Sequence, residues 1–223
     1  MDSGKAVRYA VVDIETTGEN MVKNGLIAFG VAIGNAQTGL IEDTFQVFVR
    51  PVGGDDYVWE QRCVDEFWHR NDEMKETKAA LLKKVAEEGK STFAAMSEFE
   101  HWVNDGRTPE FLDSLVFISD TAGYDIGWLN YLLGSCGMKS MNYIVGGSYR
   151  PIFDSSSFHR GIACKLPSDG MWGAESAAYA ALKAPGDMNP FAANHMPVDD
   201  ATSICWDVMN IHRLIVQRRN NGN

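Results

Sequence analysis

Two carboxylates interrupt what otherwise reads as a buried β-strand near the start of the chain. Residues 9–18, YAVVDIETTG, begin with apolar side chains and then carry Asp13 and Glu15. Side chains at positions i and i+2 of a strand share a face, so Asp13 and Glu15 point one way and Ile14 points the other. Like charges held together repel, and burial raises the cost. The pair therefore predicts a bound cation with further ligands elsewhere in the chain.

The composition is that of an ordinary globular protein. The chain has 223 residues, of which 45% are hydrophobic and 22% are charged, so we expect a single domain over residues 1–223. We find neither an apolar run of roughly 18 residues, as a membrane span needs, nor the apolar core of a signal peptide. These features predict a soluble, intracellular protein, in the cytoplasm or, if the chain is viral, in the infected cell.

The net charge of −10 argues against binding nucleic acid through clustered lysines and arginines. It does not exclude an enzyme that holds a phosphate through metal ions, because a bound cation inverts the local field. The four cysteines lie far apart and form no zinc-binding pair, so we expect reduced thiols at Cys63, Cys136, Cys164 and Cys205.

The first third of the chain predicts three antiparallel strands. Residues 7–15, 25–35 and 39–51 are apolar runs joined by short turns, and Pro51 closes the third. Residues 114–120 predict a fourth strand. Five segments have the composition or spacing of helices, and they span residues 58–71, 73–89, 91–106, 124–137 and 198–219.

Two further predictions concern packing and order. In the segment 91–106, the stripe of Phe93, Met96, Phe99 and Val103 is expected to lie in the core. Residues 138–196 are rich in Gly, Ser, Pro and Asn without periodicity, and such long irregular regions usually carry function or are partly disordered. Residues 218–223 read as a polar tail.

Two aspartates offer the further ligands. Asp125 shares the apolar face of its predicted helix, so it points toward the core side. Asp200 begins the apolar stripe of the last helix, whereas its neighbour Asp199 aligns with polar residues and suits a first-turn position favoured by the helix dipole. His195 lies five residues before Asp200 and is the histidine best placed to join them. We assign no role to the other histidines, which are His69, His101, His159 and His212.

At this point the motifs VVDIETTG, SDTAGYDIGWLNYLL and HMPVDDA resemble the three exonuclease motifs of the DEDDh 3′→5′ exonucleases, in order and spacing. The resemblance spans residues 9 to about 205. It implies a ribonuclease H-like α/β fold, with a mixed central sheet whose first three strands are antiparallel and which is flanked by helices. It also implies two-metal hydrolysis of nucleic acid from a free 3′ end to nucleoside monophosphates.

The resemblance assigns roles to five residues. It makes Asp13, Glu15, Asp125 and Asp200 the metal ligands and His195 the general base. Two ions of Mg²⁺ or Mn²⁺ are the expected cofactors, since hard cations prefer carboxylate oxygens. The residues Thr16, Thr17 and Gly18 would let backbone groups approach the terminal nucleotide.

The dipeptide SD before the second motif and the segment FDSSSFHRG, residues 153–161, resemble the phage, viral and mycobacterial branch. The sequence departs from many members at Asp120 and Thr121, where they carry His-Asn, and at Ala28, where they carry Glu. Neither change removes a metal ligand. Both leave the substrate preference open, and Asp120 is a candidate secondary ligand.

Several alternatives remain open from the sequence. The substrate is RNA or single-stranded DNA, because recognition of the 2′-hydroxyl depends on loop geometry within residues 138–194. A catalytically weak nucleic-acid-binding domain of the same fold is the second reading. A non-catalytic acidic interaction protein fits the charge but leaves the carboxylates unexplained. A membrane is not an expected partner, and homodimer formation is undecided.

Overall fold

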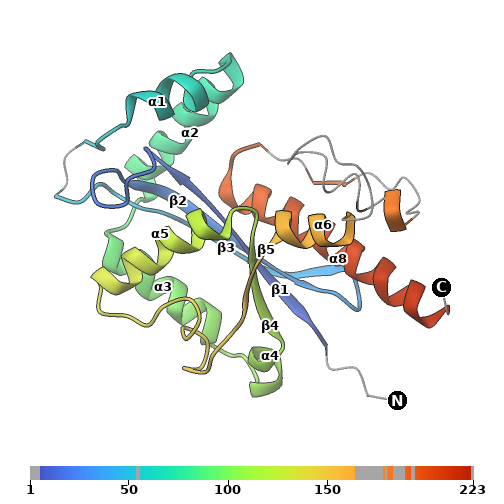
Figure 1. Cartoon of the computed structure of the whole chain (residues 1–223). Coiled ribbons are helices and arrows are strands. Elements are labelled where there is room, and N and C mark those ends of the chain that lie inside the picture. Colours follow the sequence, from blue (N-terminus) through green and yellow to red (C-terminus); the bar gives the residue numbers. More distant parts are fainter. Residues whose placement is uncertain are drawn as a thin grey trace.

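A five-stranded mixed sheet forms the centre of the molecule (Figure 1). The structure is a computed structural model that describes residues 6–53, 56–163, 178, 180–182, 189–191 and 194–221. The strand order is β3-β2-β1-β4-β5. The strands are β1 (Arg8–Thr16), β2 (Leu26–Asn35), β3 (Leu40–Phe48), β4 (Leu115–Ser119) and β5 (Ile152–Asp154).

The predicted meander is confirmed. Strand β2 runs antiparallel to both β1 and β3, whereas β4 pairs with β1 and β5 pairs with β4 in parallel. Strand β3 ends before Pro51, and Val49 pairs with Lys90 as an isolated bridge. Strand β4 ends at Ser119, opposite Val12, so the last residues of β1 extend past the end of β4.

Helices cover both faces of the sheet (Figure 1). The even-numbered residues of β1, Ala10 to Ile14, pack into one apolar cluster with α3 (Thr92–Asn104) and α5 (Ala122–Ser135). The odd-numbered residues Tyr9 and Val11 pack against α8 (Pro197–Asn220). The period of two along β1 therefore directs Asp13 and Glu15 toward α8, opposite Ile14, as the sequence predicts.

The close approach of α8 to the sheet depends on a glycine. A Cβ atom at Gly30 would lie 2.3 Å from the backbone nitrogen of Val198 and 2.4 Å from the carbonyl carbon of Pro197. Gly30 pairs with Asp13 across the β1–β2 ladder. The absence of a side chain at this position thus lets the first turn of α8 reach the end of β1, where the carboxylates are.

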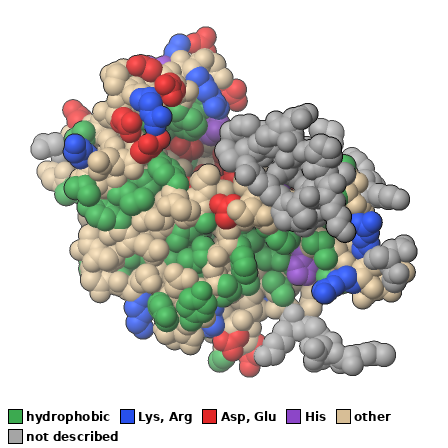
Figure 2. Space-filling view, in the orientation of Figure 1, with side chains coloured by type: hydrophobic (Ala, Val, Ile, Leu, Met, Phe, Trp, Pro, Cys, Tyr) green, Lys and Arg blue, Asp and Glu red, His purple; other side chains and the backbone are tan. Residues whose placement is uncertain are grey.

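The other helices follow the predicted segments with changes. The predicted helix 58–71 is shorter and consists of α1 (Gln61–Cys63) and the π-helical turn η1 (Val64–Trp68). Helix α2 (Asp72–Glu88) begins at the Asn71 side chain, which accepts from the Met74 amide, and it ends at Gly89. A short helix α4 (Pro109–Asp113) precedes β4. Acidic and basic side chains mix over the α1–α2 region at the top of Figure 2.

Two predictions were wrong in part. Phe93 is 61% exposed, whereas Met96, Phe99 and Val103 are buried, because Phe93 lies in the first turn of α3, before the stripe meets the sheet. The region 138–196 is not irregular throughout, since it contains β5 and α6 (Ser155–Ala163). Strand β5 has three residues and is too short to show a period of two. Helix α6 is short and begins with three serines, so it shows no clear apolar stripe. Residues 164–177, 179, 183–188 and 192–193 lie outside the described residues.

No helix within the described residues has the length and apolar character that a membrane crossing requires.

Candidate active site

The end of β1 carries the first two acidic side chains of the site. Glu15 is buried, and Asp13 is partly buried with its Oδ2 atom enclosed and without a hydrogen-bond partner among the described residues. The site lies where β1 extends past the end of β4. In open α/β sheets, ligands bind in such crevices at the carboxyl ends of parallel strands.

Helix α5 contributes the third carboxylate. Asp125 is 4% exposed, and its Oδ2 accepts hydrogen bonds from the hydroxyls of Ser119 and Thr121. Thr121 immediately precedes α5, and Ser119 ends β4. The turn between β4 and α5 therefore fixes the orientation of Asp125, and the predicted burial of this side chain is confirmed.

Helix α8 contributes the fourth carboxylate and the loop before it contributes the histidine. Asp200 Oδ1 accepts from the backbone amides of Asn194 and His195 at 2.8 and 3.0 Å. These bonds hold the loop against the helix, and His195 has a left-handed φ of 59°. Strained backbone of this kind is common at functional sites. Asp200 Oδ2 remains directed at the ring of His195.

His195 faces the acidic side chains through one ring nitrogen. Its Nδ1 lies 3.7 Å from Glu15 Oε1 and 3.7 Å from Asp200 Oδ2. These three residues offer ligand atoms that all lie within 4.8 Å of one another. On the other side of the ring, Nε2 lies 3.0 Å from an Arg70 nitrogen, and the Phe67 ring meets the imidazole edge to face.

Burial and mutual repulsion make the carboxylates unusually hard to ionise. Burial raises the pKa of Asp13 well above its usual value, and the negative charges of Glu15, Asp125 and Asp200 raise it further. Burial raises the pKa of Glu15 to about 7, against the opposing effect of His195. Burial also raises the pKa of Asp125 to about 6. Full ionisation of these buried carboxylates therefore destabilises the folded protein unless a cation compensates their charges.

These shifts predict how the stability of the metal-free protein depends on pH. A raised folded-state pKa means that stability is fully present below the unfolded value, near 4.3 for Glu, and is lost as pH rises through about 7 for Glu15. In EDTA, we expect the wild type to lose about 1–3 kcal/mol more stability between pH 5 and pH 8 than Glu15→Gln does. Thermal unfolding of both proteins at the two pH values measures this difference. Equal losses in the two proteins would contradict it.

A cavity of about 680 Å³ joins these groups. Its lining includes the five predicted residues, and the carboxylate of Asp120 as well. Asp120 Oδ1 accepts hydrogen bonds from Ser155 and Ser156 at the start of α6, so this oxygen is already engaged. Its role as a secondary ligand stays a prediction.

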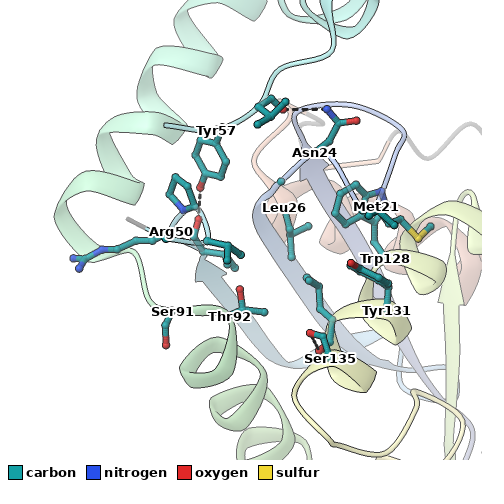
Figure 3. Close-up of a pocket in the computed structure, with 18 of the residues that line it drawn as sticks. Met21, Asn24, Leu26, Arg50, Tyr57, Ser91, Thr92, Trp128, Tyr131 and Ser135 are labelled. Carbon is teal, nitrogen blue, oxygen red and sulfur yellow. Dashed lines mark hydrogen bonds between the residues drawn. The ribbon is translucent and has the colours of Figure 1, made fainter. Parts of the chain in front are cut away.

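A larger cavity of about 890 Å³ is lined in part by residues 21–26 (Figure 3). Tyr57, Trp128 and Tyr131 line it together with Met21 and Leu26. Among the described residues that line it, Asp56 is the only one with a carboxylate. This lining therefore lacks the group of acidic ligands that the smaller cavity provides.

The Thr-Thr-Gly turn is held from several sides. Thr16 Oγ1 lies 2.5 Å from the Tyr124 hydroxyl, which also donates to the carbonyl of Gly18. Thr17 is fully buried, and its hydroxyl donates to the Val58 carbonyl and accepts from the Gly25 amide. The side chain of Thr17 therefore holds neighbouring loops together, and a contact of Thr17 with substrate stays a prediction, as it does for Thr16 and Gly18.

The remaining candidates lie outside the acidic cluster. Asp199 is exposed and accepts from the Asn194 side chain. His212 lies 2.6 Å from the Tyr9 hydroxyl, and His101 is exposed beside Asp105. The cysteines of the described residues, which are Cys63, Cys136 and Cys205, are free thiols, and Cys164 lies outside that part.

Sequence reasoning missed two side chains that contact His195, which are Phe67 and Arg70. Phe67 and Arg70 come from η1 and the turn after it. No spacing rule connects them to His195, because the contact spans 125 positions. The structure marks this region by a π-helical turn, a feature that is frequent at functional sites. The sequence alone does not reveal that turn.

No family model matches the sequence, and neither does any curated protein. Solved structures do match the fold. Cell-death related nuclease 4 has a TM-score of 0.60 at 14% identity, over 93% of this chain and 64% of that chain. A zinc-bound complex of E. coli ExoI with single-stranded DNA has a TM-score of 0.58 at 13% identity, over 96% of this chain and 41% of that chain.

A 3′-exonuclease in a structure of 3′-end specific recognition of histone mRNA stem-loop has a TM-score of 0.53 at 15% identity. That match covers 99% of this chain and 84% of the other. This chain thus spans less than two thirds of the first two structures. At these identities the likeness establishes the fold, and it confirms the expected ribonuclease H-like sheet flanked by helices. The phage, viral and mycobacterial branch stays a prediction.

Proposed function

We propose that this chain is a metal-dependent 3′→5′ exonuclease of the DEDDh type that hydrolyses single-stranded nucleic acid to nucleoside monophosphates. The observation that carries the proposal is the convergence of four carboxylates and a histidine from β1, α5 and α8 on one cavity. Fold likeness to solved structures of a nuclease and of a 3′-exonuclease supports it. The fold alone does not decide between an enzyme and a binding domain, because one fold can carry either function.

The residues fit divalent metal ions. Asp13 Oδ2 is buried and finds no partner among the described residues, and an unpaired buried oxygen of this kind is costly unless a cation or a donor satisfies it. Glu15 and Asp200 present oxygens to the same space. We assign two ions of Mg²⁺ or Mn²⁺ to Asp13, Glu15, Asp125 and Asp200. Such ions neutralise the charge that develops on the phosphate and lower the pKa of water.

The chain itself supplies the base. We assign to neutral His195 the acceptance of a proton from the attacking water. The water oxygen bonds to phosphorus, the bond from phosphorus to the 3′ oxygen of the preceding nucleotide breaks, and that oxygen takes a proton from solvent. The strained loop and the amide bonds to Asp200 position His195 beside the carboxylates.

The Thr-Thr-Gly turn adjoins this site and supports recognition of a free strand end. Thr16 and Gly18 line the catalytic cavity next to Glu15, and Tyr124 holds both of them. We assign the contact with the terminal nucleotide to the backbone groups of Thr16 and Gly18. The role of Thr17 is to support the turn. The proposed partner is therefore nucleic acid with a free 3′ end, and both DNA and RNA remain candidate substrates. As the sequence predicts, we assign this activity to a single domain.

The direction of hydrolysis gives the test of this function. We expect an end-labelled single strand to be degraded when its 5′ end is blocked and to persist when its 3′ end is blocked. Duplex should be a poorer substrate, because unstacking the terminal base costs a few kcal/mol. RNA and DNA oligonucleotides incubated with Mg²⁺, Mn²⁺ or EDTA, and resolved on a gel, measure both effects.

Two outcomes would replace the proposal. Cleavage of a circular single strand at the rate of a linear one would indicate an endonuclease. Tight binding of single strands without product in any metal would favour the second candidate, a nucleic-acid-binding domain of the same fold. The complete set of acidic side chains and the enclosed Asp13 oxygen favour the enzyme.

A further inference from the structure

Arg70 is an exposed cation that contacts two residues of the acidic cavity lining, His195 and Phe67. One guanidinium nitrogen lies 3.0 Å from His195 Nε2, and the guanidinium carbon lies 5.2 Å from the centre of the Phe67 ring. The Phe67 ring in turn touches the edge of His195. Phe67 and His195 line the acidic cavity, and Arg70 contacts both of them from outside that lining.

No carboxylate within the described part of the fold neutralises the charge of Arg70. Among the residues that the structure describes, no carboxylate forms an ion pair with Arg70, although the chain has a net charge of −10. The nearby Arg62, which lines the cavity itself, pairs with Glu19 and Glu60. The charge of Arg70 is therefore less compensated by carboxylates than that of Arg62, and it is available to an anion from outside.

The hydrogen bond to His195 has a direction. A guanidinium has five donors and no acceptor, so His195 Nε2 must accept and the ring proton must lie on Nδ1, facing Glu15 and Asp200. In this arrangement neither ring nitrogen has a free lone pair. An imidazole that accepts a proton from water must first lose its bond to Arg70.

We propose that Arg70 binds a backbone phosphate of the single-stranded substrate and gives up His195 Nε2 when it does so. This inference rests on the proposed function. A phosphate oxygen is anionic and suits the planar fork of the guanidinium, so it is a better acceptor than a neutral imidazole nitrogen. The face of Phe67 keeps the guanidinium beside the cavity lining during the exchange. Phosphate binding thereby frees His195 Nε2, and with it the imidazole ring, from the bond to Arg70.

Binding and kinetics of Arg70 variants test the inference. We expect Arg70→Met to raise KM, and the Kd of a single strand with a phosphorothioate 3′-terminal linkage, about tenfold. The slope of log affinity against log salt should fall by about 0.7, the value for one phosphate contact on a single strand. Arg70→Lys keeps the charge but loses the planar fork of the guanidinium, so its KM and Kd should lie between those of the wild type and of Arg70→Met. Fluorescence anisotropy and initial rates give these quantities.

Arg213→Met is the matched control, because it removes the same charge about 20 Å along α8 from Asp200. A second measurement leaves the protein unchanged. A neutral methylphosphonate, moved along the strand one linkage at a time, should weaken wild-type binding at one position and leave Arg70→Met binding unaffected there. If Arg70→Met does not fold, the scan on the wild type decides the question, because uniform binding at every position would overturn the inference.

Unchanged Kd and salt slope in Arg70→Met would overturn the inference. A lower kcat at unchanged KM would also overturn it, because it would show that Arg70 only positions His195. Failure of the proposed function gives a different result, in which the wild type releases no nucleotide from any single strand. The anisotropy measurement still compares wild type with Arg70→Met in that case.

Discussion

Asp13→Asn and Asp200→Asn should each lower the rate of hydrolysis by about 10²–10³-fold, the scale of losing one electrostatic contact to a developing charge. Both side chains present oxygen atoms to the acidic cavity, from β1 and from α8. An amide is nearly isosteric with a carboxylate but carries no charge, so it binds divalent cations weakly. Rates at saturating Mg²⁺ and Mn²⁺ measure the loss.

The adjacent residue provides the matched control for this prediction. Asp199 is exposed and lies outside the cavity lining, so Asp199→Asn should keep nearly the wild-type rate. EDTA should abolish wild-type activity, and added Mg²⁺ or Mn²⁺ should restore it. Full activity in EDTA, or equal effects of Asp199→Asn and Asp200→Asn, would refute the assignment of the metal ligands.

The substitution Asp13→Asn should also separate function from stability. Asp13 Oδ2 is buried without a partner among the described residues, and neighbouring negative charges repel it. The amide that replaces the Asp13 carboxylate removes this repulsion and adds a donor for the adjacent carboxylates. Asp13→Asn should therefore unfold in EDTA at the wild-type temperature or above it, although it is inactive. Loss of activity without loss of stability is what a metal ligand, and not a core residue, gives.

The acidic cluster could be predicted because its members interrupt regular patterns. Asp13 and Glu15 break an apolar strand at positions of the same face, and Asp125 breaks the apolar face of a helix. Both breaks are local and follow from the periods of strands and helices. The antiparallel meander at the start of the chain followed from the same periodicity and from short turns.

The features that were missed depend on contacts between distant segments. No sequence pattern around Gly30 predicts its close approach to Pro197 and Val198, yet that approach brings Asp200 near Asp13. The pairing of β5 with β4 was missed because a short strand at the sheet edge gains its order from its neighbour. Arg70 was missed for the same reason, since its contact with His195 exists only after both segments have folded.

His195→Ala is expected to lower the rate about 10²–10⁴-fold, the usual contribution of a general base. The substitution removes the imidazole but leaves the four carboxylates, so binding of metal and substrate should change little. His101→Ala, which removes an exposed histidine on α3, should have no such effect. Rates at saturating metal, with thermal unfolding as a check on folding, make this comparison.

The pH profile then identifies what the imidazole does. Without metal, the Glu15 carboxylate raises the pKa of His195, whereas burial lowers it, and bound cations would lower it as well. A base must be neutral, so wild-type activity should rise with pH as the imidazole loses its proton. Water in a metal site also titrates, and a rising profile by itself does not identify the group. The remaining activity of His195→Ala should lack the part of the rise that the imidazole causes. If this variant keeps the wild-type rate and profile, His195 is not the base, and its left-handed backbone serves only to hold the loop on Asp200.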